Sequence, residues 1–266
     1  KRKLDISGSL TSWPQDVFVP IHERWVGSLQ WGKRLAEYAK GALAYNDDYL
    51  YVAAKVSDDS PMQNAATEPM HVFKGGDAVD VTLALDPKAD PARTAAAPGD
   101  FRLILSFVKG KPTAVLYRPI SPDAPASAHA TFQSPVGTTS IEEVRVVPEA
   151  QVAYKVDTGL QNERFWTLTA AIPWTALGIK PPPPDAIVRG DIGILRSDPN
   201  GVQTASRVYW SGKTQTVVCD VPSETRLIPA LWGELLFEGD NVLSEDSILK
   251  GKDTDDFIPE APEMNL

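Results

Sequence analysis

The sequence predicts an all-β protein: a two-sheet antiparallel β-sandwich of the immunoglobulin-like or jelly-roll type. Two observations predict it. Short segments in which apolar and polar residues alternate recur along the chain, and a period of two is typical of strands with one buried face. The 23 prolines and 18 glycines among 266 residues indicate many loops between short strands. We also expect one short helical turn and an irregular C-terminal tail.

The composition narrows the class of protein. Hydrophobic residues make up 42% of the chain, which is ample for a core, and 266 residues suit one all-β domain. The net charge of −9, from 26 basic and 35 acidic residues, argues against nucleic acid or an anionic membrane as the partner. No apolar run approaches the roughly 20 residues of a transmembrane helix, and the first residues lack the apolar region of a signal peptide. Cys219 is the only cysteine, so no intrachain disulfide forms.

The clearest strand lies between Gly75 and Asp86, bounded by two glycines and by Asp86-Pro87. Alternate residues divide it into two faces. One face is apolar and is predicted to be core: Val79, Val81, Leu83 and Leu85. The other carries an acid and a hydroxyl among small residues: Ala78, Asp80, Thr82 and Ala84. We interpret this second face of a central strand as the open, functional surface of the sandwich.

Other segments of the first half predict further strands. Ala42 to Tyr45 and Tyr49 to Ser57 indicate a hairpin around Asn46-Asp47-Asp48. Phe101 to Phe107 places Arg102 opposite a core stripe, and Thr113 to Arg118 is its hairpin partner. The stretch from Asp5 to Pro14 is interpreted as an edge strand and turn. Three segments are predicted to be irregular or loops: Val17–Trp31, Met62–Lys74 and Pro119–Thr139.

The second half predicts six strands and one helical turn. The strands are Ile141–Val147, Val152–Asp157, Phe165–Ile172, Asp191–Leu195, Arg207–Trp210 and Glu234–Phe237. The helical turn runs from Pro173 to Gly178, with proline at its start and glycine at its end. From Gly239 the chain is acidic and has no period. We therefore expect a sandwich over residues 1–238 and a tail over residues 239–266 that is disordered alone or ordered on a partner.

Five motifs in the same order resemble the family 9 carbohydrate-binding modules and their DOMON-like relatives. They are Ile6-Ser7-Gly8-Ser9-Leu10-Thr11-Ser12-Trp13, the segment from Ala44 to Asp58, Gly76-Asp77-Ala78-Val79-Asp80-Val81, the segment from Ala171 to Gly178, and Trp232-Gly233-Glu234-Leu235. The resemblance spans most of residues 5 to 238. It implies a two-sheet sandwich in a secreted or periplasmic protein that is attached to or partnered with something larger. It also implies a sugar end held between two aromatic rings by an acid and an arginine, and structural calcium.

The resemblance places the acid at Asp80 and the arginine at Arg102. The strand pattern agrees, because both residues fall on the non-core face of their strands and can meet if the strands are neighbours. The first ring position matches Phe73 or Lys74, and the second matches Trp210. Two alternatives stay open at this stage: a structural ion pair between Asp80 and Arg102, and a core position for Trp210. Four other tryptophans are predicted to be core: Trp13, Trp166, Trp174 and Trp232.

Acidic turns offer oxygen ligands for calcium, which prefers several of them. The candidates are Asp47, Asp58 and Asp198, with Asp48, Asp59 and Asp191 as further choices; the alternative is that these turns are simply solvated. Haem is the least favoured candidate cofactor. Some relatives ligate it through a methionine and a lysine, and Met62, Met70 and Lys74 share one loop. The alternative for the methionines is packing.

The sequence contains none of the catalytic or nucleotide-binding motifs G-x-S-x-G, H-E-x-x-H and P-loop. We therefore expect a non-catalytic, extracytoplasmic module that binds a sugar or polysaccharide end. The alternative is a structural subunit with the same sandwich and no sugar site, joined to a larger assembly through its tail. A haem-binding electron-transfer subunit is the third choice.

Overall fold

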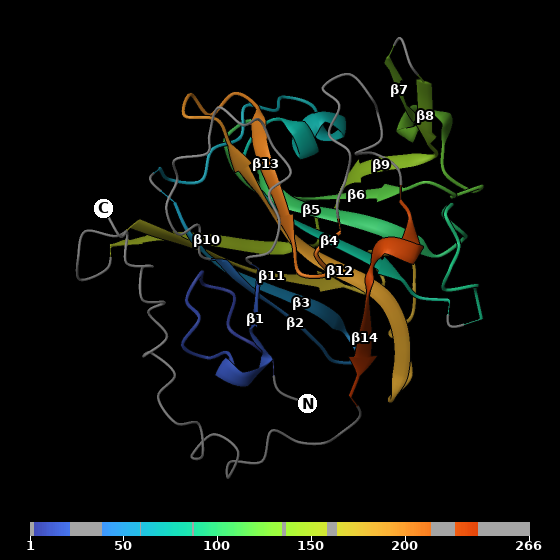
Figure 1. The fold of residues 1–266 in the computed structure, drawn as a ribbon, viewed down its shortest axis with the longest axis horizontal. Helices are drawn as coiled ribbons and strands as arrows, with labels where there is room; N and C mark the ends of the chain where they lie inside the picture. Colours follow the sequence, from blue (N-terminus) through green and yellow to red (C-terminus); the bar gives the residue numbers. More distant parts are fainter. Residues whose placement is uncertain are drawn as a thin grey trace, which may run out of the picture.

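The computed structural model describes residues 3–21, 39–58, 60–86, 88–134, 137–158, 164–213 and 227–238. Two antiparallel sheets lie face to face in these ranges, which confirms the predicted β-sandwich (Figure 1). The predicted tail 239–266, most of the segment Val17–Trp31, Asp59 and Cys219 lie outside the described residues. No helix in the described ranges has the length and hydropathy of a membrane span.

The first sheet has five strands in the order β1-β2-β3-β11-β10. Its strands are β1 (Val19–Pro20), β2 (Ala39–Tyr45), β3 (Tyr49–Ser57), β10 (Gln151–Thr158) and β11 (Arg164–Pro173). The predicted hairpin of β2 and β3 is confirmed, with Tyr45 opposite Leu50 at the turn. A hydrogen-bonded turn follows β11: Leu177 N donates to Pro173 O at 3.2 Å, and Gly178 ends the turn at a φ of +64°. This is the helical turn predicted from the sequence.

The second sheet has seven strands in the order β13-β12-β4-β5-β6-β9, with β14 paired to β12. Its strands are β4 (Ala78–Ala84), β5 (Asp100–Val108), β6 (Lys111–Arg118), β9 (Glu143–Val146), β12 (Ala186–Ser197), β13 (Thr204–Tyr209) and β14 (Gly233–Phe237). Strand β12 is long enough to pair with three neighbours, β4, β13 and β14. Strand β4 is therefore central, as its sequence predicts.

The main core lies between the sheets. The apolar face of β4 contributes Val79, Val81 and Leu83, each with 0% exposed surface, and Leu85 packs at its edge. The alternate residues of β3, β5 and β11 enter the same cluster, which also contains Trp166 and Trp174. The predicted core tryptophans are confirmed, because Trp13 and Trp232 are also buried, in smaller clusters outside the sheets.

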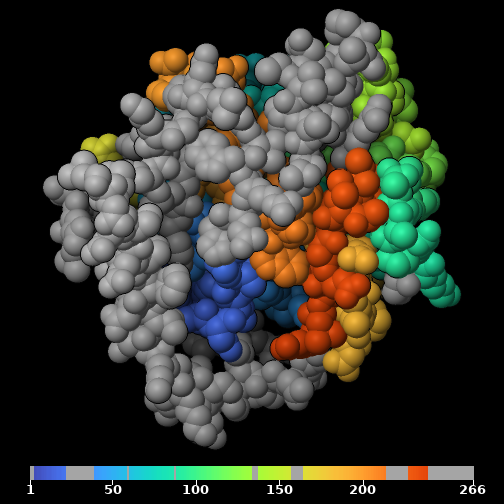
Figure 2. Space-filling model, viewed as in Figure 1, coloured from blue at the N-terminus to red at the C-terminus, as the bar shows by residue number. Residues whose placement is uncertain are grey.

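The outer face of each sheet is covered as well. Over the five-stranded sheet lie the N-terminal segment and the short helix η1 (Gln15–Val17), packed through Trp13 on Tyr51 and its neighbours. Over the seven-stranded sheet lie η3 (Pro69–Lys74) and the hairpin of β7 (Ala130–Ser134) and β8 (Gly137–Ile141). The short helix η6 (Pro229–Leu231) leads into β14, and both lie on the face seen in Figure 2, in red, beside the end of β13, in orange.

Several local predictions were wrong. The segment Val17–Trp31, predicted to be irregular, contains β1, and the predicted strand Ile141–Val147 is divided between β8 and β9, which belong to different sheets. The segment from Asp5 to Pro14 forms turns and no strand, because it docks by isolated bonds: Gly8 N donates to Thr169 Oγ1 at 2.9 Å, and Thr167 Oγ1 donates to Gly8 O at 2.7 Å. The loop Met62–Lys74 contains η3. The loop Pro119–Thr139 contains the short helix η4 (Ala126–Ala128) and β7, whose inward residues are too few to produce a clear alternation.

Candidate functional site

A cluster of polar side chains lies on the outer face of the seven-stranded sheet. Strand register places it there. Asp80 of β4 lies opposite Gly193 of β12, which lies opposite Tyr209 of β13. One step along, Thr82 lies between Arg102 of β5 and Asp191 of β12. We call this cluster the polar centre: Asp80, Thr82, Arg102, Asp191, Tyr209 and Lys213.

Asp80 and Arg102 form a two-point ion pair, as their neighbouring strands predicted. Arg102 Nε donates to Asp80 Oδ1 at 3.0 Å, and Nη2 donates to Oδ2 at 2.7 Å. The Tyr209 hydroxyl donates to the same Oδ2 at 2.7 Å. The parallel fork of guanidinium and carboxylate is the strongest form of charged hydrogen bonding in proteins. Both carboxylate oxygens of Asp80 therefore have partners within the protein.

Gly193 is the reason that Tyr209 reaches Asp80. A Cβ at this position would lie 2.2 Å from Cδ1 of the Tyr209 ring, a distance that no side chain tolerates. Because glycine has no Cβ, the ring lies flat across β12 and its hydroxyl reaches the carboxylate of Asp80, two strands away from β13. The small residue in β12 thus sets the position of the aromatic ring of the polar centre.

Lys213 follows β13 and turns back into the polar centre. Its ammonium lies 3.4 Å from Asp191 Oδ2 and 3.7 Å from the centroid of the Tyr209 ring, with the Trp232 ring at 5.8 Å. Asp191 also accepts hydrogen bonds from Ser211, at 3.1 Å from N and 2.6 Å from Oγ. A lysine between two rings and a carboxylate has both cation–π and ionic partners. Two positive and two negative side chains are thus balanced in the polar centre.

Thr82 is the exception in this network. Its side chain is 2% exposed, and Oγ1 has no hydrogen-bond partner in the described structure. An unpaired buried hydroxyl costs about 1–3 kcal/mol, so native proteins rarely retain one without a role or a bound polar molecule. The hydroxyl belongs to the same face as the Asp80–Arg102 pair and the Lys213–Asp191 pair. It is an uncommitted polar group at the middle of an otherwise satisfied network.

The expectation of an open face requires correction. Asp80 is 1% and Arg102 3% exposed, and every residue of β4 is buried. The cover comes from η3, which directly precedes β4 in the chain, and from the more distant β7–β8 hairpin. The Phe73 ring of η3 lies 5.4 Å from the Arg102 guanidinium and packs edge-on against Phe132 of the β7–β8 hairpin at 5.4 Å. The polar centre is therefore enclosed, and its ion pair has the burial that the structural alternative predicted.

Burial and the ion pairs shift the pKa values of these groups. Burial opposes ionisation of Asp80, but the charge and hydrogen bonds of Arg102 outweigh it and hold the pKa of Asp80 below its ordinary value. Burial raises the pKa of Asp191. Burial also lowers the pKa of Lys213, and the charges of Asp191 and Asp80 offset only part of that shift. Burial thus favours the neutral forms of the second pair, while the first pair stays ionised.

The two predicted ring positions differ in their outcome. Phe73 lies beside Arg102, whereas its neighbour Lys74 is exposed. Trp210 packs against the core between the sheets, on the opposite face from Asp80, so it does not reach the polar centre. Its neighbour Tyr209 occupies the place expected for Trp210. The alternation Arg207-Val208-Tyr209 places Tyr209 on the same face as Arg207 and could have indicated this position. No pattern in the sequence indicated that Lys213 turns inward.

The predicted cofactor residues do not assemble. Asp47 lies in the β2–β3 turn, Asp58 lies near Arg196 at 3.7 Å, and Asp198 accepts backbone N–H groups of its own loop at 2.8 and 3.2 Å. Within the described ranges no three His, Cys, Asp or Glu residues are grouped as metal ligands. The calcium prediction stays a prediction. For haem, Met62 packs in the core between the sheets and Met70 against the outer cluster, and the methionine–lysine ligation stays a prediction.

Comparisons with known proteins give structural similarity only. No protein-family profile and no curated protein matches the sequence. A family 9 carbohydrate-binding module from Caldicellulosiruptor kristjanssonii is similar in structure: in its complex with glucose it is 15% identical, with a TM-score of 0.47 over 91% of this chain and 96% of that one. In its complex with cellotriose it is 16% identical, with a TM-score of 0.49 over 91% and 94%. This is the family that the sequence motifs resemble.

Proposed function

We propose that this chain is a non-catalytic carbohydrate-binding module whose ligand contacts the polar centre. The observation that supports the proposal most is the uncommitted Thr82 hydroxyl beside a fixed carboxylate–guanidinium pair. Sugar hydroxyls both donate and accept hydrogen bonds. Asp80 and Asp191 accept, Arg102 and Lys213 donate, and Thr82 does both. The Trp232 ring lies 5.8 Å from the Lys213 ammonium and could offer an apolar face for sugar C–H groups.

The burial of the polar centre sets a condition on binding. Asp80, Thr82 and Arg102 are each at most 3% exposed, so a ligand reaches them only when the outer layer moves. The Phe73 ring lies over Arg102, and it belongs to the short 3-10 helix η3, whose hydrogen-bond geometry is poorer than that of an α-helix. In the proposed mechanism the ring of Phe73 withdraws and a sugar end takes its place over the guanidinium.

The second candidate is a structural or interaction subunit that has the sandwich without a sugar site. A specific observation favours it: Asp80 is fully bonded to Arg102 and Tyr209, and both partners of the pair are buried. In that role the pair only orders the sheet, and the chain binds a larger assembly through other surfaces. An extracytoplasmic location is part of both proposals.

Thr82→Val separates the two candidates, because valine keeps the shape of threonine and removes only the hydroxyl. If the hydroxyl contacts a sugar, the loss of one hydrogen bond of about 0.5–1.5 kcal/mol weakens binding roughly twofold to twelvefold. The stability of the variant should equal or exceed that of the parent, since an unpaired buried hydroxyl is gone. Affinity electrophoresis against soluble β-glucan and xylan, followed by calorimetry with their oligosaccharides, measures the binding.

Thr169→Val is the matched control. Thr169 is also buried in a strand, but it lies in the other sheet and its hydroxyl accepts a hydrogen bond from Gly8 N at 2.9 Å. This variant should lose stability and keep its sugar affinity. No retention of the parent protein on any of these polysaccharides would favour the structural candidate, and equal affinity of parent and Thr82→Val would remove Thr82 from the site.

A further inference from the structure

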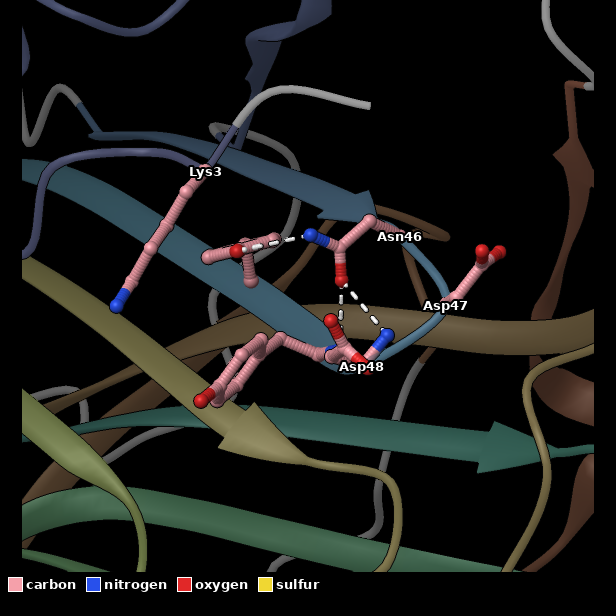
Figure 3. A pocket seen from close by; sticks show the side chains of 6 residues that line it. Lys3, Asn46, Asp47 and Asp48 are labelled. Atoms are coloured by element: carbon pink, nitrogen blue, oxygen red, sulfur yellow. Dashed lines mark hydrogen bonds between the residues drawn. The ribbon is translucent and has the colours of Figure 1, made fainter.

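The turn between β2 and β3 forms a pocket on the side of the molecule remote from the polar centre. It has a volume of about 170 Å³ and is lined by Lys3, Asn46, Asp47, Asp48, Tyr49 and Tyr51 (Figure 3). The tyrosines belong to the cluster on the outer face of the five-stranded sheet, whereas the polar centre lies on the outer face of the other sheet. We call it the turn pocket. A ligand here would not touch the polar centre.

The floor of the turn pocket is rigid. Asn46 Oδ1 accepts hydrogen bonds from Asp48 N at 2.9 Å and Tyr49 N at 2.8 Å, and Asn46 Nδ2 donates to the Tyr51 hydroxyl at 3.1 Å. The buried Trp174 fixes the turn from below: its Nε1 donates to Asn46 O at 2.9 Å, and its N donates to Asp48 O at 3.0 Å. The pocket is thus formed before any ligand arrives, which lowers the entropy cost of binding.

The rim carries polar groups that are not committed to the protein. The Lys3 ammonium lies 5.9 Å from the centre of the Tyr49 ring and makes no hydrogen bond or ion pair with a described residue. The Asp48 carboxylate likewise has no such partner in the described ranges, and no ion pair joins it to Lys3. Figure 3 shows the Lys3 side chain on one side of the pocket and Asp48 on another, with the Asp47 carboxylate pointing away.

We propose that the turn pocket is a binding site for a single neutral, polyhydroxylated ring, a monosaccharide or the end unit of a glycan. An ammonium that donates and a carboxylate that accepts suit hydroxyl groups. The Tyr49 ring supplies an apolar face for C–H groups. The volume is below the roughly 300 Å³ of pockets for drug-sized ligands, so one ring fits and a chain does not.

The inference is independent of the polar centre and is tested by amide chemical shifts of the isotope-labelled protein. D-glucose, D-galactose and D-mannose are the probes, and glycerol is the reference polyol. We expect saturable shifts confined to the amides of residues 46–51 with at least one sugar. Lys3→Met and Asp48→Ala should each weaken that binding about fivefold or more. Both side chains are exposed, so neither variant should unfold the protein.

Two control variants distinguish sugar binding at the turn pocket from binding at another lysine or at the polar centre. Lys55→Met removes a lysine that lies 4.5 Å from the Phe165 ring, outside the turn pocket, and should leave the shifts unchanged. Thr82→Val tests the polar centre and should also leave them unchanged, so failure of one site is distinguishable from failure of the other. The inference is overturned if no sugar gives saturable shifts at the turn, if glycerol matches the sugars, or if Lys3→Met and Asp48→Ala bind as well as the parent.

Discussion

Replacing Arg102 by methionine tests whether the polar centre depends on its ion pair. Methionine keeps much of the apolar stem and removes the guanidinium. The change deletes two charged hydrogen bonds to Asp80, at 3.0 and 2.7 Å, and the cation beside the Phe73 ring. Asp80 then keeps only the hydrogen bond from Tyr209 among its described partners, while it is still 1% exposed.

The expected cost is large. Removing one partner of a buried ion pair leaves an uncompensated charge and typically destabilises a protein by about 3–5 kcal/mol. Domains of this kind are stable by about 5–15 kcal/mol, so Arg102→Met should stay folded with much of its stability lost. The double variant Asp80→Leu/Arg102→Met should be more stable than the single one, because no buried charge remains.

The pH dependence gives a second readout. Without Arg102, burial is the dominant influence on Asp80, so the pKa of its carboxyl rises above the unfolded value. The native state then binds a proton more readily than the unfolded state, and the free energy of unfolding of the variant increases as the pH falls toward 4. Urea unfolding followed by tryptophan fluorescence at pH 7 and pH 5 measures both effects. A loss below about 1 kcal/mol at pH 7 would refute the reasoning.

Three further changes follow from the contacts. Gly193→Ala pushes the Tyr209 ring away and should cost about 1–3 kcal/mol in thermal unfolding, whereas an unchanged midpoint would contradict this close packing. Tyr209→Phe removes the hydroxyl bonded to Asp80 and should cost about 1.5–3 kcal/mol in urea, with a smaller loss arguing against that bond. Burial and the nearby Asp58 raise the pKa of Asp77 to about 7. Between pH 4 and pH 7 the native state therefore holds a proton that the unfolded state releases. The free energy of unfolding should then fall as the pH rises, by at most about 1.4 kcal/mol per pH unit. Asp77→Asn should flatten the stability profile over that range, and identical profiles for parent and variant would show that Asp77 does not titrate there.

The sequence predicted the parts of the fold that strand periodicity controls. The two faces of β4 were assigned correctly because successive side chains in a strand must point to opposite sides. The meeting of Asp80 and Arg102 followed from the same rule applied to neighbouring strands. Tyr209 was missed by one residue. Two adjacent aromatic residues at the end of β13 point to opposite faces, and the match to the family's second ring position selected Trp210.

The enclosure of the polar centre was not predictable in this way. It depends on η3 and on the β7–β8 hairpin, neither of which has a clear period, so the direction of Phe73 and Phe132 does not follow from a repeating pattern. Whether the outer face of a sheet is open is decided by such segments and not by the strand itself. Lys213 enters the centre from a turn, where side-chain direction follows from no repeating pattern.

A crystal structure of the protein soaked with an oligosaccharide that it retains in affinity electrophoresis tests the central claim most directly. We predict a terminal sugar ring within hydrogen-bond distance of Thr82 Oγ1, next to the Asp80–Arg102 pair, with the Phe73 ring displaced from its place beside the guanidinium. A sugar bound elsewhere while Phe73 still covers Arg102 would contradict the claim, and the ion pair would then be a structural element of the sheet.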